Sequence, residues 1–156
     1  AGGIGGMIGL ALGRFSGPSG AFDALVDSEL KTSAGLLDKA VTDFGRVVQD
    51  LLVKHKKGIV DRQFELIRVA DAAIDILSMA AVLSRCTATT KNGDKATAAY
   101  EKKVANYFCD QAATRIGVNL KSAAASNDAT VATIKDLSWT VTKNGGNPIV
   151  HPLDVL

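Results

Sequence analysis

Two carboxylates one helical turn apart, Asp71 and Asp75, are the side chains best placed to do chemistry in this sequence. They lie in an apolar stretch, and Arg68 comes shortly before them. As functional residues they would act as a general acid and base. As structural residues they would pair with Arg68 or with a cation on a neighbouring helix. Because an unpaired buried charge is costly, we favour the structural interpretation and take all three as candidates for buried ion pairs.

No other pattern of catalytic or cofactor-binding residues stands out. His55 and His151 lie far apart in the sequence, and neither Cys86 nor Cys109 has a second ligand at metal-site spacing. The glycine-rich run near the start has Ile8 where a dinucleotide-binding fingerprint needs its third glycine. We therefore predict no catalytic residue, no cofactor-binding residue and no metal ligand in this chain.

A basic cluster follows the first long amphipathic stretch. It consists of Lys54, Lys56, Lys57 and Arg62, with His55 among them. Each such cation near an anionic lipid surface contributes roughly 1 kcal/mol of binding. The cluster is either a lipid-binding patch or a solvated helix end, and the sequence leaves both interpretations open.

The first residues are rich in glycine and apolar side chains. Six of the first 13 residues are glycine, and several of these are spaced four apart, as in helices that approach another surface closely in an apolar medium. The segment is either a membrane-interface element or a flexible linker. We assign residues 1–20 to this segment and residues 21–156 to a helical bundle. The candidates for membrane contact are Ile4, Met7, Ile8, Leu10, Leu12 and Phe15.

Composition narrows the class of protein. The chain has 156 residues, of which 47% are apolar and only 5% aromatic, as expected for helices packed through Ala, Leu and Val. The 18 basic and 16 acidic residues give a net charge of +2, so we do not expect a nucleic-acid partner. Two cysteines are too few for a disulfide framework and fit a reducing compartment. Because the first residue is Ala1, we expect a processed chain or an excised fragment.

Four stretches show helical periodicity. We expect helices from about residue 36 to a glycine C-cap at Gly58, from about 61 to 86, from 96 to 125 and from 129 to 143. No alternating pattern persists long enough to build a sheet. The sequence therefore predicts an all-α fold, an up-down four-helix bundle with a Gly-rich N-terminal segment.

The second of these helices is apolar around most of its circumference, so we expect it to be the most buried. Ile74 and Leu77 are predicted to be core residues, with truncation to alanine costing about 2–5 kcal/mol. They belong to a strip made up of Phe64, Ile67, Ala70, Ile74, Leu77 and Ala81.

Residues 54–85 carry a resemblance to a known family. The run KHKKGIVDRQFELIRVADAAIDILSMAAVLSR resembles the C-terminal extension of very-long-chain acyl-CoA dehydrogenases. YFC at 107–109 and HPLD at 151–154 are also similar to this group, which includes a paralogue that assists assembly of respiratory complex I. The resemblance covers roughly residues 25–156.

The resemblance implies an accessory domain of a larger enzyme. In such an enzyme FAD oxidises a long-chain acyl-CoA to the trans-2-enoyl-CoA, and the catalytic glutamate, the flavin and the acyl pocket lie in a preceding module. The extension would pack on its own catalytic module, support a homodimer and help to hold the enzyme on the matrix side of the mitochondrial inner membrane. The N-terminal segment departs from a strongly electrostatic membrane anchor, because Arg14 is the only cation before Lys31.

Overall fold

The computed structural model describes residues 22–150 and Leu153. The chain divides into two compact units, Ala1–Ala124 and Ala125–Leu156, which are described separately. The division between them was not predicted from the sequence. The predicted boundary at residue 20 and the six candidates for membrane contact lie outside the described residues.

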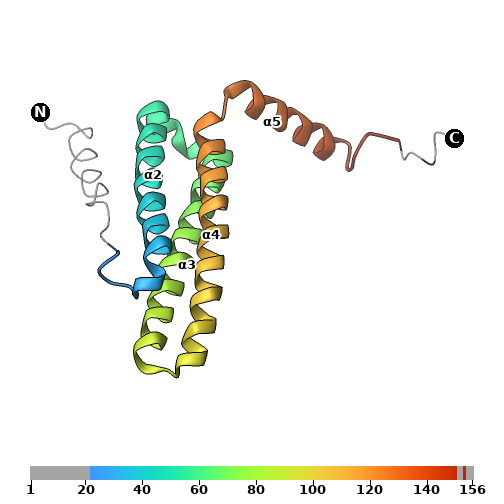
Figure 1. Ribbon diagram of the computed structural model, residues 1–156. Helices are drawn as coiled ribbons and strands as arrows, with labels where there is room; N and C mark the ends of the chain where they lie inside the picture. Colours follow the sequence, from blue (N-terminus) through green and yellow to red (C-terminus); the bar gives the residue numbers. More distant parts are fainter. Residues whose placement is uncertain (1–21, 151–152, 154–156) are drawn as a thin grey trace, which may run out of the picture. The chain divides into compact units, whose positions relative to one another are not determined.

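The described part of the first unit contains three long helices and two short ones (Figure 1). A 3-10 turn, η1, leads into the first long helix, and a second 3-10 turn, η2, joins that helix to the next. Consecutive long helices run in opposite directions along one another (Figure 1). The elements are η1 (Ser28–Leu30), α2 (Lys31–His55), η2 (Lys56–Asp61), α3 (Gln63–Asn92) and α4 (Lys95–Ala125).

The core of this unit is built from small and aliphatic side chains of all three long helices. α2 contributes Leu37 and Leu51, α3 contributes Met79, and α4 contributes Cys109 and Ile116, all of which are buried. Many of their neighbours are alanines, which allow the helices to pack with few large side chains between them.

The second unit contains α5 (Asp128–Lys143). Asn127 caps it, with its side-chain oxygen accepting a hydrogen bond from the Thr130 amide at 2.8 Å. Gly145, at φ +67°, follows the helix end. The described residues contain no strand, and the predicted all-α fold with four main helices is confirmed. Within the first unit, α2, α3 and α4 pack together as expected for a bundle.

Three predicted helix ends are wrong. α2 begins at Lys31, five residues before the expected start near residue 36. It ends at His55, and Lys56 rather than Gly58 has the positive φ, at 49°. α3 continues past Cys86 to Asn92, because threonines near its end remain compatible with a helix when they bond back to the preceding turn. The Thr90 hydroxyl donates to the Cys86 carbonyl at 2.9 Å.

The predicted burial of the second helix is also wrong in one respect. Ile74 and Leu77 are 62% and 72% exposed, whereas Met79 is fully buried. The strip expected in the core is therefore the outer side of α3, and the residues described in the first unit cover only the opposite side of this helix.

Candidate functional site

The outer side of α3 is the most unusual surface of the first unit. Ile67, Ala70, Ile74, Leu77 and Ala81 are all exposed and step along the helix by three and four residues. We call these five residues the outer stripe. None of them is charged, and neither charge nor hydrogen bonding can account for their exposure to water.

The outer stripe results from an apolar pattern that runs around most of the helix. The buried residues Ala72, Met79, Leu83 and Cys86 follow the same helical spacing on the side that faces α2 and α4. A helix that is apolar all round is normally buried on all sides. Since the described residues of the first unit cover only one side of α3, the other side is suited to a covering surface.

α4 carries a second uncovered apolar stripe. Tyr100, Val104 and Tyr107 are exposed at helical spacing, and we call them the α4 stripe. Tyr100 and Val104 line a small hollow of about 330 Å³ together with Val82 and Arg85 of α3. Exposed tyrosines beside an arginine are typical of protein–protein contacts.

α2 has the opposite character. Its outer side is polar, with exposed Thr42, Arg46, Gln49 and Asp50, as expected for a helix that faces water. The exposed apolar residues of the three long helices therefore lie mainly on α3 and α4.

Polar pairs join α3 to α4. The Arg115 guanidinium donates two hydrogen bonds to Asp75, at 3.0 and 2.6 Å, and this hydrogen bonding raises the pKa of Arg115. Arg68 donates to Asn119 at 3.2 Å, and Asp71 is exposed. The three predicted ion-pair candidates are thus not brought together, and Asp75 has its cation on a neighbouring helix.

The basic cluster is divided in the structure. Lys54, Lys56 and Lys57 are exposed at the end of α2 and the start of η2. Arg62 instead donates through Nε to Oε1 of Glu65 at 2.8 Å, and its side chain is only 14% exposed. Glu65 is buried and was not singled out in the sequence, although its spacing of three from Arg62 is that of a helical ion pair. Arg62 is therefore part of a buried ion pair and not of a solvated patch.

A polar cluster fixes the start of the bundle to α4. Lys102 lies 2.9 Å from Asp27 and 2.8 Å from Glu29, and the Ser33 hydroxyl lies 2.6 Å from Oδ1 of Asn106. Hydrogen bonding to Lys102 holds the pKa of Asp27 below its ordinary value, and the two carboxylates raise the pKa of Lys102. No signal in the sequence connected these residues, because 73 positions separate Ser33 from Asn106.

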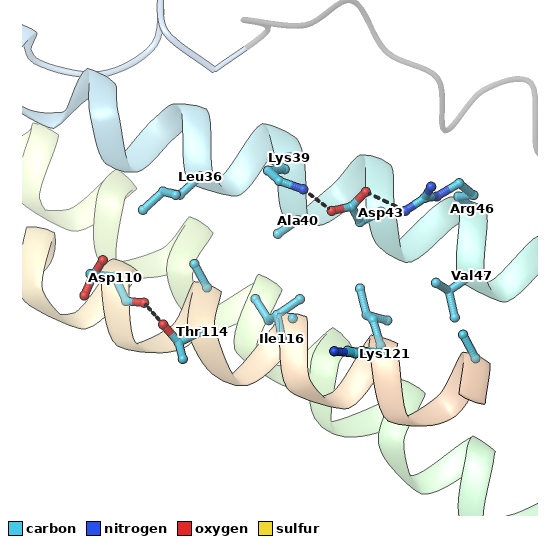
Figure 2. Close-up of a pocket in the computed structure, with 14 residues that line it drawn as sticks. Leu36, Lys39, Ala40, Asp43, Arg46, Val47, Asp110, Thr114, Ile116 and Lys121 are labelled. Atoms are coloured by element: carbon cyan, nitrogen blue, oxygen red, sulfur yellow. Dashed lines mark hydrogen bonds and ion pairs between the residues drawn. The ribbon is translucent and has the colours of Figure 1, made fainter. Parts of the chain in front are cut away.

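A groove of about 520 Å³ lies between α2 and α4 (Figure 2). Leu36, Val47 and Ile116 contribute apolar side chains to it. On its α2 rim, Asp43 accepts from Lys39 at 2.5 Å and from Arg46 at 3.1 Å (Figure 2). The three charges of the α2 rim thus bond to one another, while Asp110 and Lys121 of α4 add two further charges to the lining. Most of the other lining side chains are apolar, and they do not form a set of convergent catalytic groups.

The cysteines do not form a reactive site. Cys86 and Cys109 are both buried free thiols, and burial raises the pKa of both, that of Cys109 to about 11. Within residues 22–150, no group of three or more potential ligands could hold a metal ion. Among the same residues, no helix is long and apolar enough to cross a membrane.

Comparisons with known proteins identify the family. Residues 28–147 match the family described as ACAD9/ACADV, C-terminal domain. The very long-chain specific acyl-CoA dehydrogenase of Mus musculus, a mitochondrial protein, is 39% identical over 133 residues, which are 84% of this chain and 20% of that protein. The proteins of the same name from Rattus norvegicus and Homo sapiens are 35% and 38% identical and are covered over 24% and 20% of their lengths. The chain thus spans about a fifth to a quarter of these relatives, and it belongs to the C-terminal domain family of very-long-chain acyl-CoA dehydrogenases and ACAD9.

Proposed function

We propose that the chain is the noncatalytic C-terminal helical domain of a mitochondrial, FAD-dependent very-long-chain acyl-CoA dehydrogenase of fatty-acid β-oxidation, and that it packs on its own catalytic module. The uncovered outer stripe of α3 carries this proposal. Covering a fully exposed Leu or Ile side chain with apolar surface stabilises an assembly by roughly 1.5–3 kcal/mol. Ile74 and Leu77, both more than half exposed, are therefore suited to a permanent interface.

The catalytic module is the partner that best fits this surface. Curated relatives extend over about four to five times the length matched by this chain, so the domain occurs in them next to a large additional part. Interfaces between permanently associated parts are more apolar than transient ones and resemble a divided core. An uncharged stripe of Ile, Leu and Ala matches that description better than it matches a transient contact.

Flavin chemistry belongs to the catalytic module in this proposal. The groove between α2 and α4 does not fit a flavin, because Lys39 and Arg46 on its rim already bond to Asp43. Its remaining lining is largely aliphatic. When bound in the module, FAD supplies the oxidation of the acyl-CoA, and we assign no residue of this chain to that reaction.

The same proposal includes support of a homodimer and attachment to the matrix side of the inner membrane. The relatives are mitochondrial proteins by name, which supports a mitochondrial location. Two features favour contact with lipid: the exposed lysines near the end of α2, and the apolar side chains within residues 4–15.

The experiment uses the purified 156-residue chain and the separately expressed catalytic module. We expect the chain alone to show helical circular dichroism but neither FAD binding nor oxidation of palmitoyl-CoA with an artificial electron acceptor. Mixed with the module, it should sediment as a stable complex. Flavin binding or turnover by the chain alone would contradict the noncatalytic assignment, and sedimentation as two separate species would contradict docking.

An alternative function is suggested by the family itself, since its description includes ACAD9. The domain would then recruit proteins of respiratory complex I assembly. Co-purification with such proteins, unchanged when acyl-CoA oxidation is abolished in the parent enzyme, would favour this alternative.

A further inference from the structure

The end of α2 and the 3-10 turn that follows it form an exposed corner of mixed character. η2 contains no buried residue. Within eight consecutive positions the chain exposes Lys54, Lys56 and Lys57 together with Val53 and Val60, each valine being 64% exposed. We call these five residues the lysine–valine corner.

This combination differs from an ordinary solvated helix end. Cations in the last turn of a helix favour its negative pole, and that effect explains Lys54. It does not explain two exposed valines beside the cations. An interfacial membrane contact needs both kinds of side chain, because lysines reach the lipid phosphates while short apolar side chains enter the boundary between headgroups and acyl chains.

Charges around the corner limit how strongly it can attract anions. Asp50 and Asp61 are exposed nearby and oppose the three lysines. Arg62 adds no free positive charge, because it is paired with buried Glu65. A net excess of one positive charge is too small for tight binding of a polyanion such as nucleic acid, so the valines must contribute to any stable contact.

We infer that the lysine–valine corner binds the surface of a bilayer with anionic headgroups, with Val53 and Val60 inserted at the level of the headgroups. This inference rests on the membrane association proposed above and identifies the surface responsible for it. Binding through the corner should be reversible and weakened by salt.

Co-sedimentation of the whole chain with vesicles tests the corner. We would compare phosphatidylcholine vesicles with and without phosphatidylglycerol. On each kind of vesicle we would compare the double variant K56E/K57E with the charge-matched control K31E/K103E, which changes exposed lysines on α2 and α4. Because each lysine near such a surface contributes roughly 1 kcal/mol, K56E/K57E should lower the partition coefficient on anionic vesicles by about 30-fold or more. The control should stay within about threefold of the wild-type chain.

A second variant tests the apolar part of the contact. V60S keeps every charge and should still reduce binding to anionic vesicles severalfold, with unchanged circular dichroism. Equal binding by K56E/K57E and its control would overturn the inference that the corner binds lipid. If deletion of residues 1–15 alone abolished binding, the corner would be wrong while the proposed membrane association stood. An absence of binding to any vesicle would overturn both.

Discussion

Burial controls the reactivity of the two thiols of the first unit. Cys86 and Cys109 are buried free cysteines, and desolvation of the thiolate raises the pKa of both, that of Cys109 to about 11. Because the thiolate is the reactive form, we expect neither to react appreciably with an aromatic disulfide reagent near neutral pH in the native chain. Both should react at once in denaturant. Rapid modification of either thiol in the folded chain would contradict the core described above.

Asp27 should make the chain sensitive to acid. Hydrogen bonding to Lys102 and to the Glu29 amide holds its pKa below the ordinary value of 3.8. A carboxyl whose pKa is lowered by folding stabilises the fold above its ordinary pKa, and this contribution is lost as the pH falls through the lowered value. We therefore expect the free energy of unfolding to fall more steeply below about pH 4 in the wild-type chain than in D27N. Urea unfolding at several pH values in this range measures the free energy of unfolding of both proteins. The same pH dependence in both would refute the stabilising role of Asp27.

At the scale of single residues, the sequence indicates which side chains are charged but not which partner each one finds. Arg62 looked like a member of a basic patch because it follows three lysines, yet it bonds to Glu65 in the interior. Asp75 was expected to pair, and its partner Arg115 lies 40 positions away on α4. Such partners depend on the register between helices, which no local pattern encodes.

For the helices, two neighbouring residues of α3 give a sharp test. M79A removes a fully buried side chain and should lower the free energy of unfolding by about 2–5 kcal/mol. L77A changes a side chain that is 72% exposed and should shift it by no more than about 0.5 kcal/mol in the isolated chain. Chemical denaturation of both variants measures this difference. A large loss in L77A with little loss in M79A would mean that the two sides of α3 are exchanged.

The turn between α2 and α3 offers a second test. Lys56 has φ 49° and ψ −128°, a conformation that suits glycine and costs other residues about 1–3 kcal/mol. K56G should therefore raise the free energy of unfolding by about 1 kcal/mol or more. K57G is the control, because Lys57 has no positive φ, and it should be neutral or destabilising by up to about 1 kcal/mol. Equal effects of the two variants would contradict the strained turn.

The helices themselves were largely predictable. Amphipathic spacing located α2, α4 and α5 to within a few residues, and the asparagine cap of α5 falls in the break marked by Ser126 and Asn127. The side of α3 that is buried was not predictable, because Ile74 and Leu77 are at least as apolar as Ala72 and Met79. Periodicity alone cannot choose between two apolar sides of one helix, because both sides show the same spacing.

At the scale of the whole molecule, exposed apolar surface is distributed unevenly among the three long helices of the first unit. α2 presents a polar outer side, whereas α3 and α4 each present uncharged residues to water. A domain that worked alone would leave these stripes as an aggregation liability. In the docking that we propose, the catalytic module covers these stripes and the polar outer side of α2 faces solvent.

The most direct measurement is the affinity of the chain for the separately expressed catalytic module by titration calorimetry. The double variant I74K/L77K places two charges in the outer stripe, and V53K places one on an exposed valine of α2. We expect I74K/L77K to weaken binding at least about 100-fold, because each buried unpaired charge costs several kcal/mol, while its free energy of unfolding stays near that of the wild-type chain. V53K should bind like the wild type. Unchanged affinity of I74K/L77K would contradict docking through α3.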